Sequence, residues 1–302
     1  MRFPPCLVLV LLAHFLCTCG SAEKSSASPM AQKHTIDWQG HRGCRGLLPE
    51  NTIPAFLHAL TYQEIQTLEL DVVISKDNKV IVSHEPWLST EICRSANGEE
   101  LTDEKISLRS LTAAEIAEYD CGTKQHPRFP EQANRPAAKP TLLAVFAAVE
   151  AYCKEHDRTL PRFNVELKYE PALEPDYVPG RSAFASLVLQ DLDTWGHPEL
   201  VTLQCFDPPT LAEIKRQNSA ITLAYLDEFP GDLSTKMDTL GFVPQIYSPY
   251  EIHIDAQLME EAKTLGMQVI PWTVNDTTRM QTLLALGVDG IITDYPNRIP
   301  RQ

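Results

Sequence analysis

The sequence is poor in positive charge and has no long apolar run. Its 302 residues include 26 Lys and Arg against 40 Asp and Glu, for a formal net charge of −14. We therefore predict no nucleic-acid partner, because neutralising a phosphate backbone takes clustered basic residues. The main apolar stretch, Leu7 to Leu16, is half of the ~20 residues that a membrane-spanning helix needs. With 43% hydrophobic and 22% charged residues, the composition is that of a folded globular protein.

The N-terminal segment has the order of a secretory signal. Arg2 precedes the apolar stretch, and small and polar residues follow it. A Leu-Cys-Thr-Cys segment ending at Cys19 resembles a lipobox with Cys19 as the lipidated residue, and the alternative is ordinary cleavage after Ala22. We predict a signal peptide over residues 1–19, or up to residue 22, followed by a tether up to residue 34. The protein is expected to be exported, either periplasmic or membrane-anchored as a bacterial lipoprotein, with no protein partner predicted.

No two cysteines have the CxxC spacing, so a structural zinc site has no support. Three of the eight cysteines lie in the signal region. Cys93 and Cys121 flank one polar segment and can form a disulfide in an oxidising compartment. The alternative is that all the cysteines outside the signal are small buried apolar residues; these are Cys44, Cys93, Cys121, Cys153 and Cys205.

A Gly-rich phosphate loop and a Gly/Ser-rich linker are both absent. Apolar, β-branched segments alternate with amphipathic helical patterns. We expect strands at 36–40, 67–74, 162–167, 201–205, 221–226, 245–247, 268–273 and 290–293, and helices at 52–60, 141–153, 182–194, 209–217, 256–265 and 277–286. This alternation predicts a single α/β domain over residues 35–302, a (β/α)8 TIM barrel. A doubly wound sheet is the alternative, but it usually carries a Gly-rich loop after its first strand.

One long segment interrupts the alternation. Residues 79–83 are expected to pair with the second strand as a hairpin, and a polar, Pro-rich insertion then runs over residues 86–140 with one short helical pattern at 112–119. A loop of this length in a compact domain is usually functional, for example as a lid or subdomain that shapes a binding site. His126 lies in this insertion, so a role for it in the site stays open.

Chemistry-bearing side chains cluster where the predicted strands end, which is where a TIM barrel has its active site. Glu69 and Asp71 are two residues apart on one strand and point to the same side, and Glu166 ends the next strand of the barrel. Three carboxylates in one mouth repel each other unless a cation lies among them. Oxygen ligands of this kind suit Ca²⁺ or Mg²⁺. Ion pairs with Arg or Lys inside the barrel are the alternative.

Two histidines and two fixed cations complete the predicted site. His41 ends the first strand and His84 follows the hairpin, so the pair can supply one proton donor and one acceptor near neutral pH. Arg42 and Lys168 place positive charge beside the proposed metal, which suits a phosphate. Nothing marks a Ser or Cys, Cys44 included, as an activated nucleophile. The set therefore indicates phosphodiester cleavage.

Motifs along nearly the whole mature chain resemble, in order, those of the glycerophosphodiester phosphodiesterase family. They are His-Arg-Gly at 41–43, Pro-Glu-Asn-Thr at 49–52, Glu-Leu-Asp-Val at 69–72, Val-Ser-His at 82–84, Asn-Val-Glu-Leu-Lys at 164–168, Leu-Gln-Cys-Phe at 203–206, Trp-Thr-Val-Asn at 272–275 and Gly-Val-Asp-Gly-Ile-Ile-Thr-Asp at 287–294. The resemblance implies a TIM barrel with an insertion after its second strand. It also implies an acid/base pair, His41 and His84; ligands of one divalent cation, Glu69, Asp71 and Glu166; phosphate contacts, Arg42 and Lys168; and pocket-lining residues, Phe206 and Trp272.

The family resemblance also predicts a supporting set and an activity. Glu50, Asn51 and Asp294 are expected to support the site. The helical pattern at 52–60 separately predicts Asn51 as the cap of the first helix. The family usually has Asp after the second histidine, where this chain has Glu85. The implied activity is metal-dependent hydrolysis of small glycerophosphodiesters to glycerol 3-phosphate and an alcohol. The alternatives are a related phosphodiesterase acting on intact phospholipid, of phospholipase C or D type, and an exported protein that binds phosphodiesters without cleaving them.

Overall fold

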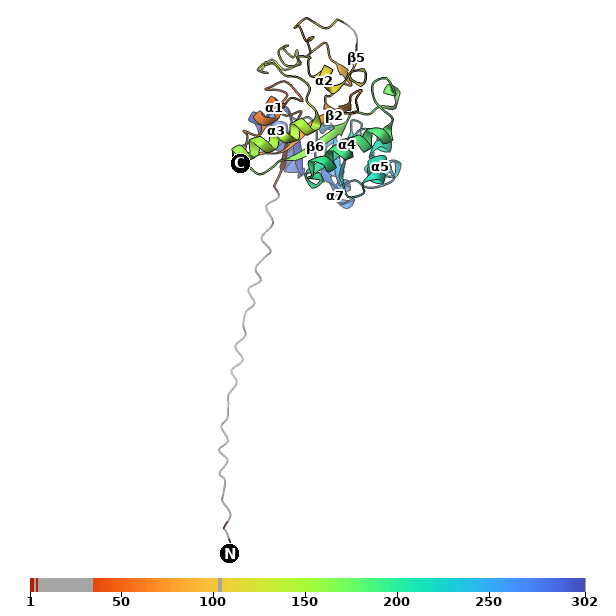
Figure 1. Cartoon of the computed structure of the whole chain (residues 1–302). Coiled ribbons are helices and arrows are strands. Elements are labelled where there is room, and N and C mark those ends of the chain that lie inside the picture. Colours follow the sequence, from red (N-terminus) through yellow and green to blue (C-terminus); the bar gives the residue numbers. More distant parts are fainter. Residues whose placement is uncertain (3, 5–34, 103–104, 302) are drawn as a thin grey trace. The chain divides into compact units, whose positions relative to one another are not determined.

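Eight parallel strands form a nearly closed barrel in the computed structural model, which describes residues 1, 2, 4, 35–102 and 105–301 (Figure 1). Their order around the barrel is β10-β9-β8-β7-β6-β2-β1-β11. The ring is completed between β10 and β11 by backbone hydrogen bonds, in which the Asp289 N–H donates to the Val269 carbonyl over 2.9 Å and the Ile292 N–H to the Pro271 carbonyl over 3.0 Å. The predicted TIM barrel is confirmed. Its strands are β1 (Asp37–Gly40), β2 (Ile65–Ile74), β6 (Arg162–Leu167), β7 (Val201–Cys205), β8 (Thr222–Asp227), β9 (Ile246–Pro249), β10 (Gln268–Val269) and β11 (Gly290–Thr293).

Helices follow the strands, as the alternation predicts, with two differences. Residues 233–240 form a helix that the sequence patterns did not indicate, and the first helix is capped by Thr52, whose side chain accepts from the Ala55 N–H, rather than by Asn51. Asp276 caps the helix Thr277–Leu286, and Gly287 ends it in the left-handed conformation. The barrel helices are α1 (Ile53–Ala59), α3 (Leu142–Glu155), α4 (Arg181–Trp195), α5 (Pro208–Gln217), α6 (Leu233–Leu240), α7 (Ala256–Thr264) and α8 (Thr277–Leu286). Single 3₁₀ turns occupy Leu108–Ser110, Pro171–Leu173, Pro198–Leu200, Glu251–His253 and Pro296–Arg298.

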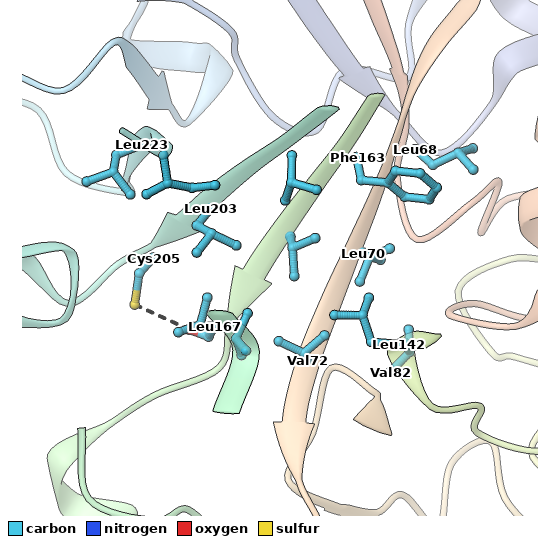
Figure 2. Packing of buried hydrophobic residues seen from close by; sticks show 14 of the residues in the cluster. Leu68, Leu70, Val72, Val82, Leu142, Phe163, Leu167, Leu203, Cys205 and Leu223 are labelled. Atoms are coloured by element: carbon cyan, nitrogen blue, oxygen red, sulfur yellow. Dashed lines mark hydrogen bonds between the residues drawn. The ribbon is translucent and has the colours of Figure 1, made fainter. Parts of the chain in front are cut away.

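The two faces of the strands bury different chemistry. Alternate residues of β2, such as Leu70 and Val72, pack outward against neighbouring strands and α3 in the main core (Figure 2). The residues between them point into the barrel, where one half is polar and carries an amide chain in which the Asn164 side chain donates to Gln39 and Gln204. The other half of the interior is apolar, built from Ala224, Ile246, Ile270 and Ile292. The polar half leads to the end of the barrel that carries the predicted site.

The insertion has a small core of its own. β3 (Val80–Val82) pairs antiparallel with β2, which confirms the hairpin. The strands β4 (Trp87–Leu88) and β5 (Ile106–Ser107) form a separate two-stranded sheet, and the short helix is α2 (Ala113–Ile116). Cys93 and Cys121 form a disulfide inside this core, whereas Cys44, Cys153 and Cys205 are free and buried. The insertion is therefore a cross-linked subdomain rather than a bare loop.

The predicted signal peptide and tether lie outside the described residues, apart from residues 1, 2 and 4. The two predicted cleavage sites, Cys19 and its lipidation included, therefore stay predictions. Among the residues that the structure describes, no helix is both long enough and apolar enough to cross a membrane.

Candidate active site

A cavity of about 420 Å³ opens at the carboxyl ends of the barrel strands. Asp71, fully buried, is the one predicted site residue that does not line it. A larger depression, about 870 Å³, lies at the opposite ends of the strands beside Tyr152 and Arg158, and none of the predicted site residues lines it. The cavity lining includes His41, Arg42, Glu69, His84, Glu166, Lys168, Phe206 and Trp272. The structure thus brings together side chains from five strands of the barrel and from the end of the hairpin strand Val80–Val82.

Three buried carboxylates form the floor of the site. Ligand oxygens of Glu69, Asp71 and Glu166 all lie within 4.8 Å of one another. Burial, and then the charges of Asp71 and Glu166, raise the pKa of Glu69 well above its usual range, and burial likewise raises the pKa of Glu166. Burial also acts to raise the pKa of Asp71, but the nearby charges of Arg42, His84 and Lys168 and the hydrogen bond from Asn51 together outweigh it, and the pKa falls. The Oδ1 atom of Asp71 is buried and has no hydrogen-bond partner among the residues that the structure describes. This crowded set of oxygens fits a hard divalent cation.

Arg42 and Lys168 are held against these carboxylates. The Arg42 backbone N–H donates to Glu69 Oε2 over 3.0 Å, and its side chain lies 3.1 Å from Asp71 Oδ2 and 2.9 Å from Glu50 Oε1. Lys168 Nζ donates to Glu166 Oε1 over 2.7 Å. Arg42 has a positive φ of 49°, a conformation that Gly43 beside it shares. The tight turn after β1 therefore aims both the backbone and the side chain of Arg42 at the acidic cluster.

His41 is fixed by a carboxylate on its far side. Its Nδ1 lies 2.6 Å from Asp294 Oδ1, and its Nε2 lies 3.8 Å from Glu69 Oε2. Burial and then the nearby Arg45 lower the pKa of His41 to about 4 against the opposing pull of Asp294. Asp294 is itself held by the Arg45 guanidinium, at 3.0 Å, and by the Asn275 amide, at 2.7 Å. The neutral ring therefore donates through Nδ1 and presents Nε2 to the cavity.

His84 is oriented in the same way by the residue that departs from the family pattern. Its Nδ1 lies 2.7 Å from Glu85 Oε1, and its Nε2 lies 3.2 Å from Lys168 Nζ. Burial opposes ionisation of Glu85, but the hydrogen bond with His84 and the charges of His84, Lys139 and Arg42 together outweigh it and lower the pKa of Glu85 to about 2. The longer Glu side chain thus reaches His84 as a charged acceptor. Both histidines turn Nδ1 to a carboxylate and Nε2 toward the same cavity.

Two aromatic side chains form the cavity wall beside Lys168. The rings of Phe206 and Trp272 meet edge to face with their centroids 5.4 Å apart. The Trp272 indole N–H donates to the Ser248 carbonyl over 2.9 Å, which fixes this ring, whereas Phe206 is 37% exposed. Both residues therefore line the cavity, as the family resemblance implies.

Several residues of the site were not singled out from the sequence. Arg45, which pairs with Asp294, comes shortly after the His-Arg-Gly motif at 41–43, and this position could have identified it as a site residue. Lys139 and Arg128 come from the insertion: Lys139 is buried and donates to the Ser83 hydroxyl over 2.8 Å, and Arg128 lines the cavity. No motif marked either of them. Asn51 and Glu50 do support the site, since the Asn51 amide donates to Asp71 Oδ2 over 2.8 Å.

Comparisons with known proteins identify the family of the chain. Residues 41–298 match the model of the glycerophosphoryl diester phosphodiesterase family. The chain belongs to that family. Because its members are phosphodiester hydrolases, the chain is an enzyme of that class. A curated relative, the glycerophosphodiester phosphodiesterase of Caldanaerobacter subterraneus subsp. tengcongensis, is 26% identical over 86% of this chain and 94% of its own length.

Two further relatives extend the comparison. A solved structure of a glycerophosphoryl diester phosphodiesterase from Silicibacter pomeroyi is 30% identical, with a TM-score of 0.79 over 88% of this chain and 92% of that one. Lysophospholipase D GDPD1 of Mus musculus is 25% identical over 86% of this chain and 83% of its own length. Family membership therefore rests on both sequence and fold.

Proposed function

We propose that this protein hydrolyses small glycerophosphodiesters to glycerol 3-phosphate and an alcohol, with one Ca²⁺ or Mg²⁺ and two histidines. The observation that carries the proposal is the convergence of His41 and His84 on one cavity above three buried carboxylates. His41 Nε2 lies beside Glu69, and His84 Nε2 lies beside Lys168. A phosphodiester in this cavity would have acid/base groups and fixed positive charge within reach.

Each side chain has a role that follows from its contacts. Glu69, Asp71 and Glu166 would hold the cation, which when bound stabilises charge on the phosphoryl oxygens. Arg42 and Lys168 would bind those oxygens and hold the diester in place. One histidine would take a proton from the attacking oxygen at Nε2 and the other would donate one to the departing alcohol. Asp294 and Glu85 keep each Nδ1 in a hydrogen bond, so only the Nε2 atoms exchange protons with the substrate.

The direct test is release of glycerol 3-phosphate from a panel of glycerophosphodiesters, with and without a chelator. We expect turnover of glycerophosphocholine, glycerophosphoethanolamine or glycerophosphoglycerol that falls to background after chelation and returns with added Ca²⁺ or Mg²⁺. Activity that survives thorough chelation would refute metal dependence. An intact, folded protein that binds glycerol 3-phosphate but cleaves none of the panel would instead support the non-catalytic alternative.

A second candidate substrate, a lysophospholipid, is favoured by a groove beside the cavity. This groove, about 630 Å³, shares His84, Lys168 and Phe206 with the cavity and continues along Leu173 and Phe229. Phe229 is 70% exposed, and apolar surface of this kind next to a site suits an apolar ligand. The mouse relative is named for lysophospholipase D activity. The panel therefore includes lysophosphatidylcholine, and faster release of choline from it than from glycerophosphocholine would favour this substrate.

A further inference from the structure

Part of the insertion is fastened to the loop that carries the catalytic residues of β1. The Gln132 side-chain amide donates to the carbonyls of Arg45 and Leu48 over 2.7 and 3.1 Å, and the Ala133 N–H donates to the Leu47 carbonyl over 2.8 Å. Phe129 is buried, and the Arg45 guanidinium lies 4.6 Å from its ring centre. Residues 126–133, which we call the strap, are therefore fixed to the same loop as His41 and Arg42.

A buried histidine sets the position of Arg128 within the strap. His126 is only 2% exposed, its ring meets Phe129 edge to face at 4.7 Å, and its Nδ1 accepts from the Arg128 backbone N–H over 3.2 Å. Its Nε2 lies 3.9 Å from Glu50 Oε2, the carboxylate that holds Arg42. The strap thus leaves the backbone of Arg128 little freedom, and the Arg128 side chain lines the cavity.

Arg128 differs from the other cations of the cavity in its pairing. Arg42 pairs with Glu50 and Asp71, Arg45 pairs with Asp294, and Lys168 pairs with Glu166. Within residues 35–102 and 105–301, no carboxylate forms an ion pair with Arg128, whose guanidinium lies 5.7 Å from the Phe129 ring centre. Its positive charge is therefore available to an anion in the cavity.

We propose that Arg128 is a substrate-binding residue, supplied by the insertion, that contacts the phosphate of the bound diester and of the glycerol 3-phosphate product. The inference rests on the proposed function. A planar guanidinium can donate two parallel hydrogen bonds to phosphoryl oxygens, and such charged bonds are stronger than neutral ones. No hydrogen bond or ion pair joins Arg128 to His41 or His84, so we expect its contribution to fall on binding rather than on proton transfer. Part of the affinity of the cavity for a phosphate would in this way depend on the insertion.

The test compares R128Q and R128K with a matched control, R135Q. Arg135 is an exposed arginine of the same insertion that does not line the cavity, so its replacement makes the same change in net charge. For R128Q we expect KM for glycerophosphocholine to rise about tenfold, with kcat within about twofold of the wild type, since uniform binding is lost. The dissociation constant of glycerol 3-phosphate, measured by calorimetry, should rise in parallel. R128K should recover part of the loss, and R135Q should match the wild type.

The outcomes separate this inference from the proposed function. Wild-type KM and glycerol 3-phosphate affinity in R128Q would overturn the role of Arg128 while leaving hydrolysis intact. A loss in R135Q equal to that in R128Q would also overturn it, because the effect would then come from net charge alone. If the wild-type protein hydrolyses no glycerophosphodiester, the proposed function fails, and calorimetry with glycerol 3-phosphate still decides whether Arg128 binds the phosphate.

Discussion

At the scale of single residues, the site depends on paired contacts that hold each reactive group in one orientation. His41 is hydrogen-bonded to Asp294, and Asp294 in turn accepts hydrogen bonds from Arg45 and Asn275. Such supporting bonds fix the ring nitrogen that faces the substrate. The predicted site residues were recognisable because each ends a strand or follows one within a motif. Arg128 and Lys139 were not, because they come from an irregular insertion with no period to relate them to the barrel.

We expect H41A and H84A each to lower kcat for glycerophosphodiesters by about 10²-fold or more, since each removes one proton-transfer group. Circular dichroism should show the same secondary structure as the wild type. H156A, at the exposed end of α3 and far from the cavity lining, should keep full activity. Near-normal turnover by either H41A or H84A would contradict the two-histidine mechanism.

At the scale of elements, the barrel strands agree with prediction best where their apolar pattern is uninterrupted. β6, β7 and β11 have the expected bounds, whereas the strand expected at 268–273 ends at Val269, because Pro271 has no N–H to donate to a ladder. α6, Leu233–Leu240, was missed because its sequence is short and largely polar. The paired strands of the insertion, β4 and β5, are only two residues long and leave no readable alternation.

The disulfide of the insertion makes a prediction at this scale. Replacing Cys93 and Cys121 together by Ser should lower the free energy of unfolding by about 2–4 kcal/mol, because the cross-link closes a long loop in the unfolded chain. The measurement is urea denaturation followed by circular dichroism. The kcat should change little, since neither cysteine lines the cavity. The control is C153S, which removes a free buried thiol and leaves the Cys93–Cys121 disulfide in place. An unchanged midpoint in the double variant would show that the cross-link adds no stability.

At the scale of the whole molecule, alternation of strand and helix was enough to predict the barrel, because eight parallel strands with crossover helices have few other ways to bury both faces. The net charge of −14 predicts no polyanionic partner but is compatible with a small phosphodiester. Part of the acidic excess lies in the carboxylate cluster itself, which a cation can convert into a site for anions. What the sequence could not predict at this scale is which part of the insertion reaches the cavity.

Export is the prediction that belongs to the full chain. Expressed in a bacterium from Met1, the protein should be found outside the cytoplasm with its N-terminus shortened. Mass spectrometry of the mature chain should place the new terminus at a lipid-modified Cys19 or at Glu23, and detergent partitioning should distinguish the two. A full-length chain recovered from the cytoplasm would contradict both routes.

The amide chain inside the barrel limits how this protein can change. Gln39 accepts from Asn164, Gln204 accepts from Asn164, and the Gln204 amide donates to Glu69 Oε1 over 2.9 Å. An apolar replacement of any one of these three amides would leave a buried donor or acceptor without its partner, at a cost of about 1–3 kcal/mol. The three amides are therefore coupled. As the sequence evolves, we expect them either to be replaced together or to stay unchanged.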